Sequence, residues 1–217
     1  MGQKINPIGF RVGSFKGWKS RWFSETSGYK DLLIEDIRIR EDLMEKLRVA
    51  GITSVEIERL PKSIAIILTV SRPGVVIGRG GTGIEDVKKR VLATIKSVRG
   101  SVPKDLKVDL QVTEVKNSEV SAQLVLDRIV GELERRMPQR RAVGRAIERV
   151  MQAGGLGVKV VLAGRIGGAD IARVEKYQQG SVPTQTMRAN IDYAERPALL
   201  KKGYVGVKVW INRKNEE

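Results

Sequence analysis

The sequence has no cysteine and no histidine among its 217 residues. Disulfides are therefore excluded, and so are the common zinc sites and all catalysis by thiolate or imidazole. Catalysis by carboxylates and magnesium bound through oxygen stay open. No segment approaches the roughly 18 apolar residues of a membrane-spanning helix, and residues 1–6 hold no signal-peptide core. We therefore expect a cytoplasmic protein with no membrane partner.

What the sequence has in excess is positive charge. Lysine and arginine total 40 against 25 acidic residues, so the formal net charge is +15 and the isoelectric point is near 10.2. Such an imbalance indicates a polyanionic partner, with nucleic acid the first candidate and an acidic membrane surface the second. Hydrophobic residues make up 41% of the chain, which is enough for two small cores.

The patterning predicts an α+β protein in four parts. Residues 1–28 are a basic and aromatic arm, 29–116 a first domain, 117–212 a second domain with helices packed on a β-sheet, and 213–217 a tail. The arm lacks the apolar periodicity of a folding unit, so it is either a disordered tail or an extension that orders on a partner. Its interleaved rings and cations favour contact with RNA bases and phosphates. The cations of interest are Lys4, Arg11, Lys16, Lys19 and Arg21.

Apolar spacing predicts the elements of the first domain. Residues 29–50 have helical spacing, and two β-rich runs at 55–58 and 64–70 form a hairpin. An apolar stripe predicts an amphipathic helix over 82–98. Strict alternation then predicts a strand over 108–112.

The second domain is expected to mix helices and strands. A helix capped by Ser118 runs to about 137, where Pro138 interrupts it, and another covers about 140–153. The remaining expected elements are strands at 158–162, 187–193 and 204–211 and a short helix at 169–177.

The clearest motif is a glycine loop at residues 78–81. Gly78-Arg79-Gly80-Gly81 follows an apolar pair and opens the helix that begins at Thr82. Glycines let a sugar-phosphate backbone come close, and a helix N-terminus offers unpaired N–H groups and partial positive charge. The loop and the elements around it make residues 29–115 similar to a KH domain of type II, which clamps about four nucleotides of a single strand.

Two other interpretations of this loop compete. The spacing Gly78-x-Gly80-x-x-Gly83 also satisfies the dinucleotide fingerprint, but residues 72–74 separate it from its strand and no acid stands where the ribose ligand belongs. A purely structural turn is the second, and Arg79 at the tip argues against a buried turn. No P-loop sequence is present, so ATP binding by that motif is not supported.

A second glycine cluster follows the strand expected at 158–162. We expect it to end that strand and lead into the helix at 169–177, as another phosphate contact. The candidate residues are Gly164, Arg165, Gly167, Gly168 and Arg173.

Arginines crowd the helix expected at 140–153 and the residues before it. A helical wheel places apolar residues on one side and Arg141, Arg145 and Arg149 on the other. A solvated face is the ordinary explanation of a charge run. Like charges one turn apart repel, however, so RNA phosphates gripped by guanidinium groups are favoured. The full set is Arg135, Arg136, Arg140, Arg141, Arg145 and Arg149, against one acid, Glu148.

Five separated motifs, at residues 1–7, 76–84, 164–173, 189–193 and 206–211, resemble the bacterial small-subunit ribosomal protein S3 family. The resemblance covers nearly the whole chain. It implies a KH domain and a C-terminal α/β domain in the head of the small ribosomal subunit, bound to ribosomal RNA. It also implies a position where messenger RNA enters, beside ribosomal proteins four and five. Ribosomal proteins ten and fourteen are the implied neighbours in the head.

The resemblance also implies roles for single residues. Arg140, Arg141 and Arg145 align with a basic motif that lines the messenger channel and helps to open messenger helices. Gly144 and Gly80 stand where the family commonly has a cation. No enzyme activity, cofactor or metal is implied. Two other hypotheses stay open: a free KH-domain regulator of messenger RNA, and a nuclease or lyase, which the missing acidic metal cluster disfavours.

Overall fold

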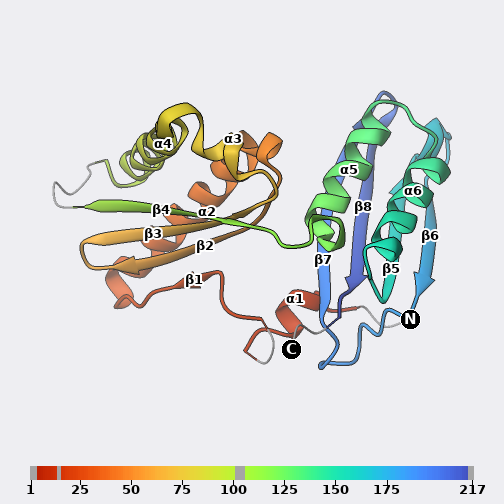
Figure 1. Ribbon diagram of the computed structural model, residues 1–217, viewed down its shortest axis with the longest axis horizontal. Coiled ribbons are helices and arrows are strands. Elements are labelled where there is room, and N and C mark those ends of the chain that lie inside the picture. Colours follow the sequence, from red (N-terminus) through yellow and green to blue (C-terminus); the bar gives the residue numbers. More distant parts are fainter. Residues whose placement is uncertain (1–3, 14–15, 101–105, 215–217) are drawn as a thin grey trace. The chain divides into compact units, whose positions relative to one another are not determined.

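The computed structural model describes residues 4–13, 16–100 and 106–214. Contacts between residues divide the chain into two units, Trp18–Lys116 and a second one that joins Met1–Gly17 to Asn117–Glu217. Each unit has its own β-sheet, its own helices and its own hydrophobic core (Figure 1). The mixture confirms the expected α+β class.

The first unit has the element order of a type II KH domain, with the short strand β1 added. Its four strands form one sheet in the order β1-β2-β3-β4, in which β2 and β3 are antiparallel and β3 and β4 are parallel. The elements are β1 (Ser20–Arg21), α2 (Thr26–Lys46), a 3-10 turn (Arg48–Ala50), β2 (Ile52–Leu60), β3 (Ser63–Val70), α3 (Pro73–Ile77), a second 3-10 turn (Arg79–Gly81), α4 (Thr82–Arg99) and β4 (Lys107–Glu114). The helices, hairpin and final strand expected for this domain are thereby confirmed.

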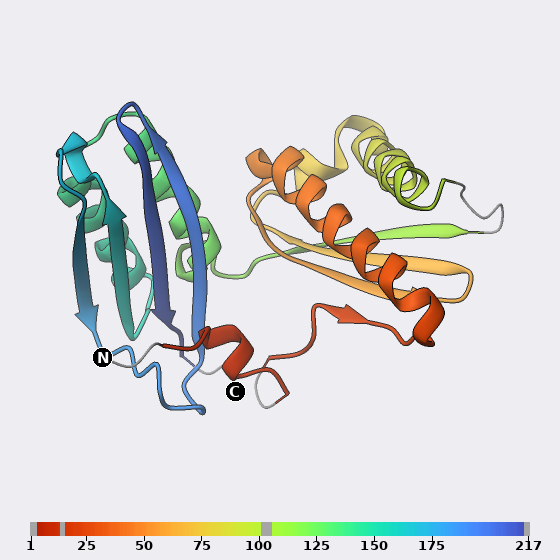
Figure 2. The same ribbon diagram turned by 180° about the vertical axis from the view of Figure 1, so that it is seen from behind.

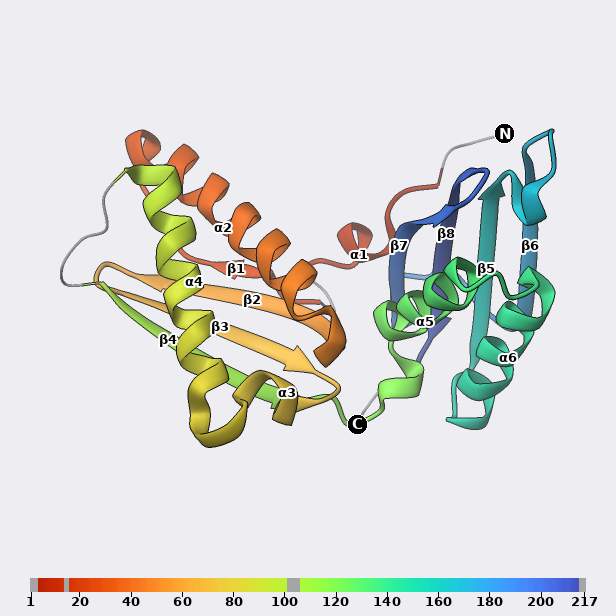
Figure 3. The same ribbon diagram turned by 90° about the horizontal axis from the view of Figure 1, so that it is seen from above.

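The core of this unit lies between the sheet and the helices α2 and α4, which run over the same face (Figure 3). Side chains alternate along β3, so Ile64, Ile66 and Leu68 all point to this face and are at most 2% exposed. Val91 and Ile95 meet them from α4, where their spacing of one turn puts both on one side of the helix. Burial of each such side chain contributes roughly 1.5–3 kcal/mol.

The second unit contains a fully antiparallel sheet in the order β6-β5-β8-β7. Helices α5 and α6 pack on one face, and Figure 2 shows the opposite face. Along β5, Val158, Val160 and Leu162 are completely buried against Leu126 and Ile129 of α5. The elements are α1 (Pro7–Phe10), a 3-10 turn (Ser118–Val120), α5 (Ala122–Glu134), α6 (Gln139–Gln152), β5 (Gly157–Gly164), a 3-10 turn (Ile166–Gly168), β6 (Arg173–Gly180), β7 (Ile191–Leu200) and β8 (Gly203–Asn212).

The prediction of a helix at 169–177 is wrong, because residues 173–177 belong to strand β6 (Arg173–Gly180). The 3-10 turn before it contains Gly167 and Gly168 with φ angles of 65° and 82°, left-handed conformations that help to reverse the chain. Strand β6 then pairs antiparallel with β5, and Tyr177 lies opposite Val160. The second glycine cluster therefore joins two strands and does not open a helix.

Two boundaries also differ from the prediction. Ser118 does not cap the long helix, because it begins a 3-10 turn and α5 starts only at Ala122. The strand expected at 187–193 overlaps only the start of β7, which continues to Leu200. Pro197 lies within β7, and it is tolerated there because β7 is an edge strand with one side unpaired.

Candidate nucleic-acid interface

The glycine loop lies between α3 and α4 and exposes its backbone. Gly80 and Gly81 have φ angles of 64° and 82°, and a side chain built at either position would meet no atom within 4 Å. Arg79 at the tip is exposed. The two glycines therefore serve an unusual backbone conformation and leave the loop open to a close-fitting ligand. A loop open on this side is not the buried structural turn that competed with the KH interpretation.

Close packing of α3 against α4 holds the loop in place. A Cβ atom on Gly83 would lie 2.4 Å from the carbonyl oxygen of Val76, and one on Gly78 would lie 2.9 Å from the nitrogen of Gly83. Only glycine fits this crossing. Because Gly78 follows helix α3 and not a strand, the loop lacks the strand-to-helix geometry of a dinucleotide site.

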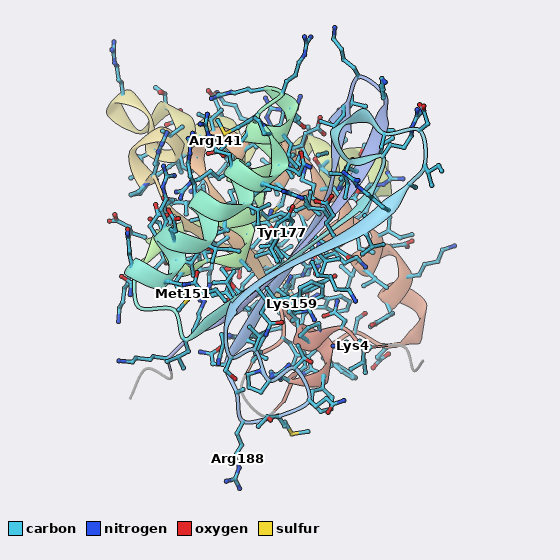
Figure 4. The ribbon with its side chains drawn as sticks, turned by 90° about the vertical axis from the view of Figure 1, so that its right-hand side faces the viewer. Lys4, Arg141, Met151, Lys159, Tyr177 and Arg188 are labelled. Carbon is cyan, nitrogen blue, oxygen red and sulfur yellow. The ribbon has the colours of Figure 1, made fainter. Side chains whose placement is uncertain are left out.

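Helix α6 has two opposed faces, as its spacing predicted. Val143 and Val150 are fully buried against the sheet, with Ala142, Ala146 and Ile147 beside them. The arginines of the other face are exposed, and Figure 4 shows Arg141 among them. No ion pair joins a carboxylate to Arg135, Arg136, Arg140, Arg141, Arg145 or Arg149 in the described part of the chain. The positive charge of this face is therefore available to an outside anion.

Arg136 connects this face with the second glycine cluster. It occupies the left-handed region with φ of 62°, where its backbone N–H caps the end of α5 by donating to the carbonyl of Leu133 at 2.9 Å. Arg136 also lines a cavity of about 490 Å³, together with Gly167 and Gly168. The structure thus brings together two groups of residues that lie apart in the sequence.

Two family descriptions match the chain. Residues 38–120 match the family described as KH domain, and residues 129–211 match the one described as Ribosomal protein S3, C-terminal domain. The glycine loop lies in the first match, and all six arginines of the arginine face lie in the second.

Full-length relatives agree with these matches. A "Small ribosomal subunit protein uS3" from Persephonella marina is 47% identical over 97% of this chain and 89% of its own length. Proteins of the same name from Caldicellulosiruptor saccharolyticus and Shouchella clausii are 43% and 42% identical, over 97% and 98% of this chain and 91% and 93% of their own lengths. The chain belongs to the ribosomal protein S3 family. This family is structural and not enzymatic, which confirms the expectation that the chain is not an enzyme.

Some of the residues predicted to contact RNA are instead bonded to other parts of this S3-family chain. Arg11 is completely buried and donates to four carbonyl oxygens, those of Pro7, Thr184, Thr186 and Ala189, at 2.8–3.0 Å. The prediction that Arg11 contacts RNA is therefore wrong, because the folded chain already surrounds its guanidinium group.

Other predicted cations divide into paired and unpaired groups. Lys16 pairs with Asp192 at 3.4 Å, and Arg21 pairs with Glu56 and Glu58 at 3.1 Å. Arg165 and Arg173 of the second glycine cluster pair with Asp170 and Glu175 at 3.1 and 3.0 Å. Lys4 and Lys19 are exposed, and no ion pair occupies either of them in the described ranges.

One cation that lies beside a ring was not among the predicted contact residues. Lys159 on β5 holds its ammonium 5.6 Å from the centre of the Trp210 ring, whose other neighbour, Tyr193, lies 5.1 Å away between ring centres. Buried and outward residues alternate along each strand, and this alternation placed Lys159, Trp210 and Tyr193 on the outward side of their strands. Alternation alone could not show that the three strands meet at these side chains.

No helix of the described residues has the length and apolar content needed to cross a membrane. Within the same residues, no group of acidic side chains is placed to hold a metal ion.

Proposed function

We propose that the chain binds ribosomal RNA in the head of the small subunit and lines the channel where messenger RNA enters. The observation that carries this proposal is the exposed cationic face of α6, whose arginines have no carboxylate partners among the described residues. The printed names of the relatives, small ribosomal subunit proteins, support a place in that subunit. The family resemblance supports ribosomal proteins ten and fourteen as neighbours in the head, and four and five at the channel.

The glycine loop gives the first unit its RNA contact. Gly80 and Gly81 leave the backbone bare, so a phosphodiester strand can approach to van der Waals distance, while the start of α4 provides partial positive charge. Arg79 is the one cation within the loop and adds a guanidinium group for a phosphate. Contacts of this kind recognise charge and backbone shape, and they carry little information about base sequence.

The arginine face gives the second unit its contact with messenger RNA. Arg140, Arg141 and Arg145 lie within two turns of α6, and the buried opposite face fixes the helix to the sheet. A rigid row of charges attracts both strands of a messenger helix through their phosphates. Holding the strands apart at a narrow channel would favour the unpaired state of the messenger.

The test is a reconstituted translation system with ribosomes that carry the triple variant R140A/R141A/R145A. We expect slower translation of messengers with stable downstream helices and little change for unstructured ones. The matched control removes three exposed cations from the first unit, in the variant R38A/K46A/K62A. Equal slowing of both messengers by the α6 variant would contradict a role in helix opening, whereas a normal rate on structured messengers would contradict any contact at the channel.

A free KH-domain regulator remains the competing function. It would share the glycine loop and the overall charge, so binding to RNA alone does not separate the two. Sedimentation in moderate salt does: a subunit protein travels with small subunits, and a free regulator stays near the top of the gradient.

A further inference from the structure

The face of the second sheet that turns away from α5 and α6 carries a group of lysines with no acidic partner. Lys159 lies on this face at the centre of β5, and Figure 4 shows Lys4 on the same side of the unit. Neither side chain forms an ion pair with a carboxylate in the ranges that the structure describes. The sequence places Lys4 in the basic arm, and no sequence pattern connects it with Lys159.

Strand register extends this group. Gln178 and Trp210 lie directly opposite Lys159 on the neighbouring strands β6 and β8. One step along, Lys176 and Lys208 lie opposite Val161 and are therefore diagonal neighbours of Lys159 on the same face. Lys208 is neutralised by Glu195 at 3.3 Å, but Lys176 has no such pair among the described residues. Three ammonium groups, those of Lys4, Lys159 and Lys176, thus have no carboxylate within ion-pair distance among the described residues.

The Trp210 ring fixes the central cation. The Lys159 ammonium lies 5.6 Å from the ring centre, within the range of a cation–π contact. Burial lowers the pKa of Lys159, and the nearby charges of Lys4 and Lys176 lower it further. Cations held this close together repel one another, so an anion placed between them would relieve the repulsion.

We propose that Lys4, Lys159 and Lys176 form a phosphate-binding site for a second strand of ribosomal RNA, on the sheet face opposite the arginines of α6. This inference rests on the proposed function and adds to it, because the C-terminal unit would then contact RNA on both of its faces. Lysine suits the task as a compact point charge that can move to follow a phosphate. The half-buried ring of Trp210 lies directly beneath and adds an apolar surface on which a base or ribose can rest.

An acidic protein segment is the competing occupant, and the site favours RNA over it. Lys159 and Lys176 have Gln178, Val161 and the ring of Trp210 as outward neighbours, and the cavity of about 490 Å³ that could take an apolar anchor is lined by none of them. Protein partners usually combine charge with such an anchor. A phosphodiester strand needs none, since backbone contacts and stacking are sufficient for it.

Binding of small-subunit ribosomal RNA at several salt concentrations tests the proposal. In the variant K4A/K159A we expect affinity to fall about tenfold near physiological salt, and the salt slope to fall by roughly 1–2 because two phosphate contacts are lost. The matched control K46A/K62A removes two exposed, unpaired lysines from the first unit and should change neither quantity beyond the general effect of net charge. If both double variants changed the RNA affinity and the salt slope by the same amounts, the proposed site would be disproved.

Chemical modification of lysine separates RNA from an acidic partner. Bound ribosomal RNA should protect Lys4 and Lys159 of the intact chain from acetylation, while polyglutamate of equal charge should protect them only at low salt. Equal protection by both polymers at the same salt would overturn the assignment to RNA. If the wild-type chain failed to bind ribosomal RNA at all, the proposed function itself would fall. If R140A/R141A/R145A lost RNA binding and K4A/K159A kept it, the proposed function would stand and only the lysine site would be disproved.

Discussion

The guanidinium of Arg59 donates from Nε to Oδ1 of Asp36 at 2.8 Å, and this contact between β2 and α2 is buried. The same guanidinium donates to Glu35 at 2.8 Å, and both carboxylates are completely buried. The indole N–H of Trp22 donates to the other oxygen of Asp36, also at 2.8 Å. The helix pattern would place these two acidic residues at the surface, yet both lie inside the first unit. Arg59 contacts both of them, Arg99 also pairs with Glu35 and Arg40 with Asp36, and Trp22 after β1 completes the cluster.

Removing Arg59 should destabilise the first unit strongly. The substitution Arg59→Met removes the cation that Glu35 and Asp36 share. We therefore expect the free energy of unfolding, measured by urea titration, to fall by about 3 kcal/mol. The control is Arg21→Ala, whose two ion pairs are exposed and should cost less than about 1 kcal/mol. Similar losses in the two variants would contradict the central role of Arg59.

Arg11 should act on stability and not on RNA. Three of its four hydrogen bonds reach the carbonyls of Thr184, Thr186 and Ala189, and the fourth goes to Pro7 of α1. A hydrogen bond to a charged group contributes roughly 1.5–3 kcal/mol to stability. We expect Arg11→Lys to lose about 3 kcal/mol, together with hydrogen-exchange protection around 184–191. The affinity of the folded fraction for RNA should stay the same. A selective loss of affinity with full stability would restore Arg11 as a contact residue.

Alanine substitutions in the glycine loop should separate packing from contact. Gly83→Ala places a methyl against the backbone oxygen of Val76, so we expect a loss of roughly 1–3 kcal/mol in unfolding free energy. Gly80→Ala meets no neighbour and should cost about 1 kcal/mol, for its left-handed φ alone. The added methyl would nevertheless hold a phosphate backbone away, so RNA affinity should fall several-fold in filter binding. Unchanged affinity in Gly80→Ala would show that this face of the loop does not contact RNA.

The helices and central strands could be predicted because their periodicity reports burial directly. The stripe that ends at Ile95 and the two faces of α6 are examples, since the apolar spacing places those residues in the core. Strand β6 was mistaken for a helix because it is an edge strand that is largely exposed, and Lys176 and Gln178 on its outer side gave no clear contrast with the inner side. The reversal at Gly167 and Gly168 depends on left-handed φ angles, which the spacing of glycines suggests but does not fix.

The sequence could predict that the candidate contacts are lysines and arginines, but it could not predict which groups each of them contacts in the fold. Lysine and arginine in the arm indicated an anion, yet Arg11 faces carbonyl groups more than 170 residues further along the chain. No local pattern carries that information. Lys159 was missed for the same reason, because its environment is formed by β8 and the N-terminal segment, which reach it only in the folded unit.

Acid should weaken the attachment of α5 to the turn before it. Arg128 donates to Glu119 at 2.6 Å, and this hydrogen bond lowers the pKa of Glu119 below its ordinary value of 4.5. A carboxylate with a lowered pKa in the folded state stabilises the fold above its unfolded pKa, and that contribution is lost as the pH falls through the folded pKa. The pair is partly exposed, so we expect the loss to be only about 0.5 kcal/mol. Urea titrations between pH 6 and pH 3 should show this decrement in the wild type and not in Glu119→Gln, and an equal pH dependence in both would rule out this pair as its source.

Gly144 offers a way to strengthen the arginine face. It lies within α6, beside Arg140 and Arg141 on the next turn, and a Cβ atom there would meet nothing within 4 Å. Gly144→Ala should stabilise the chain by up to about 1 kcal/mol, because glycine is a poor helix former. Gly144→Lys should gain less, about 0.5 kcal/mol, since the new ammonium is repelled by two neighbouring arginines and only partly compensated by Glu148.

The two variants should rank in the opposite order in RNA affinity, with Gly144→Lys binding more tightly than Gly144→Ala. The lysine adds one phosphate contact, so the salt slope should steepen by roughly 0.7–0.9, whereas the alanine variant should keep the wild-type slope. Translation through stable messenger helices should improve only with the lysine. If alanine and lysine tightened binding equally, the gain would come from a stiffer helix, and the charge of α6 would not be what the RNA recognises.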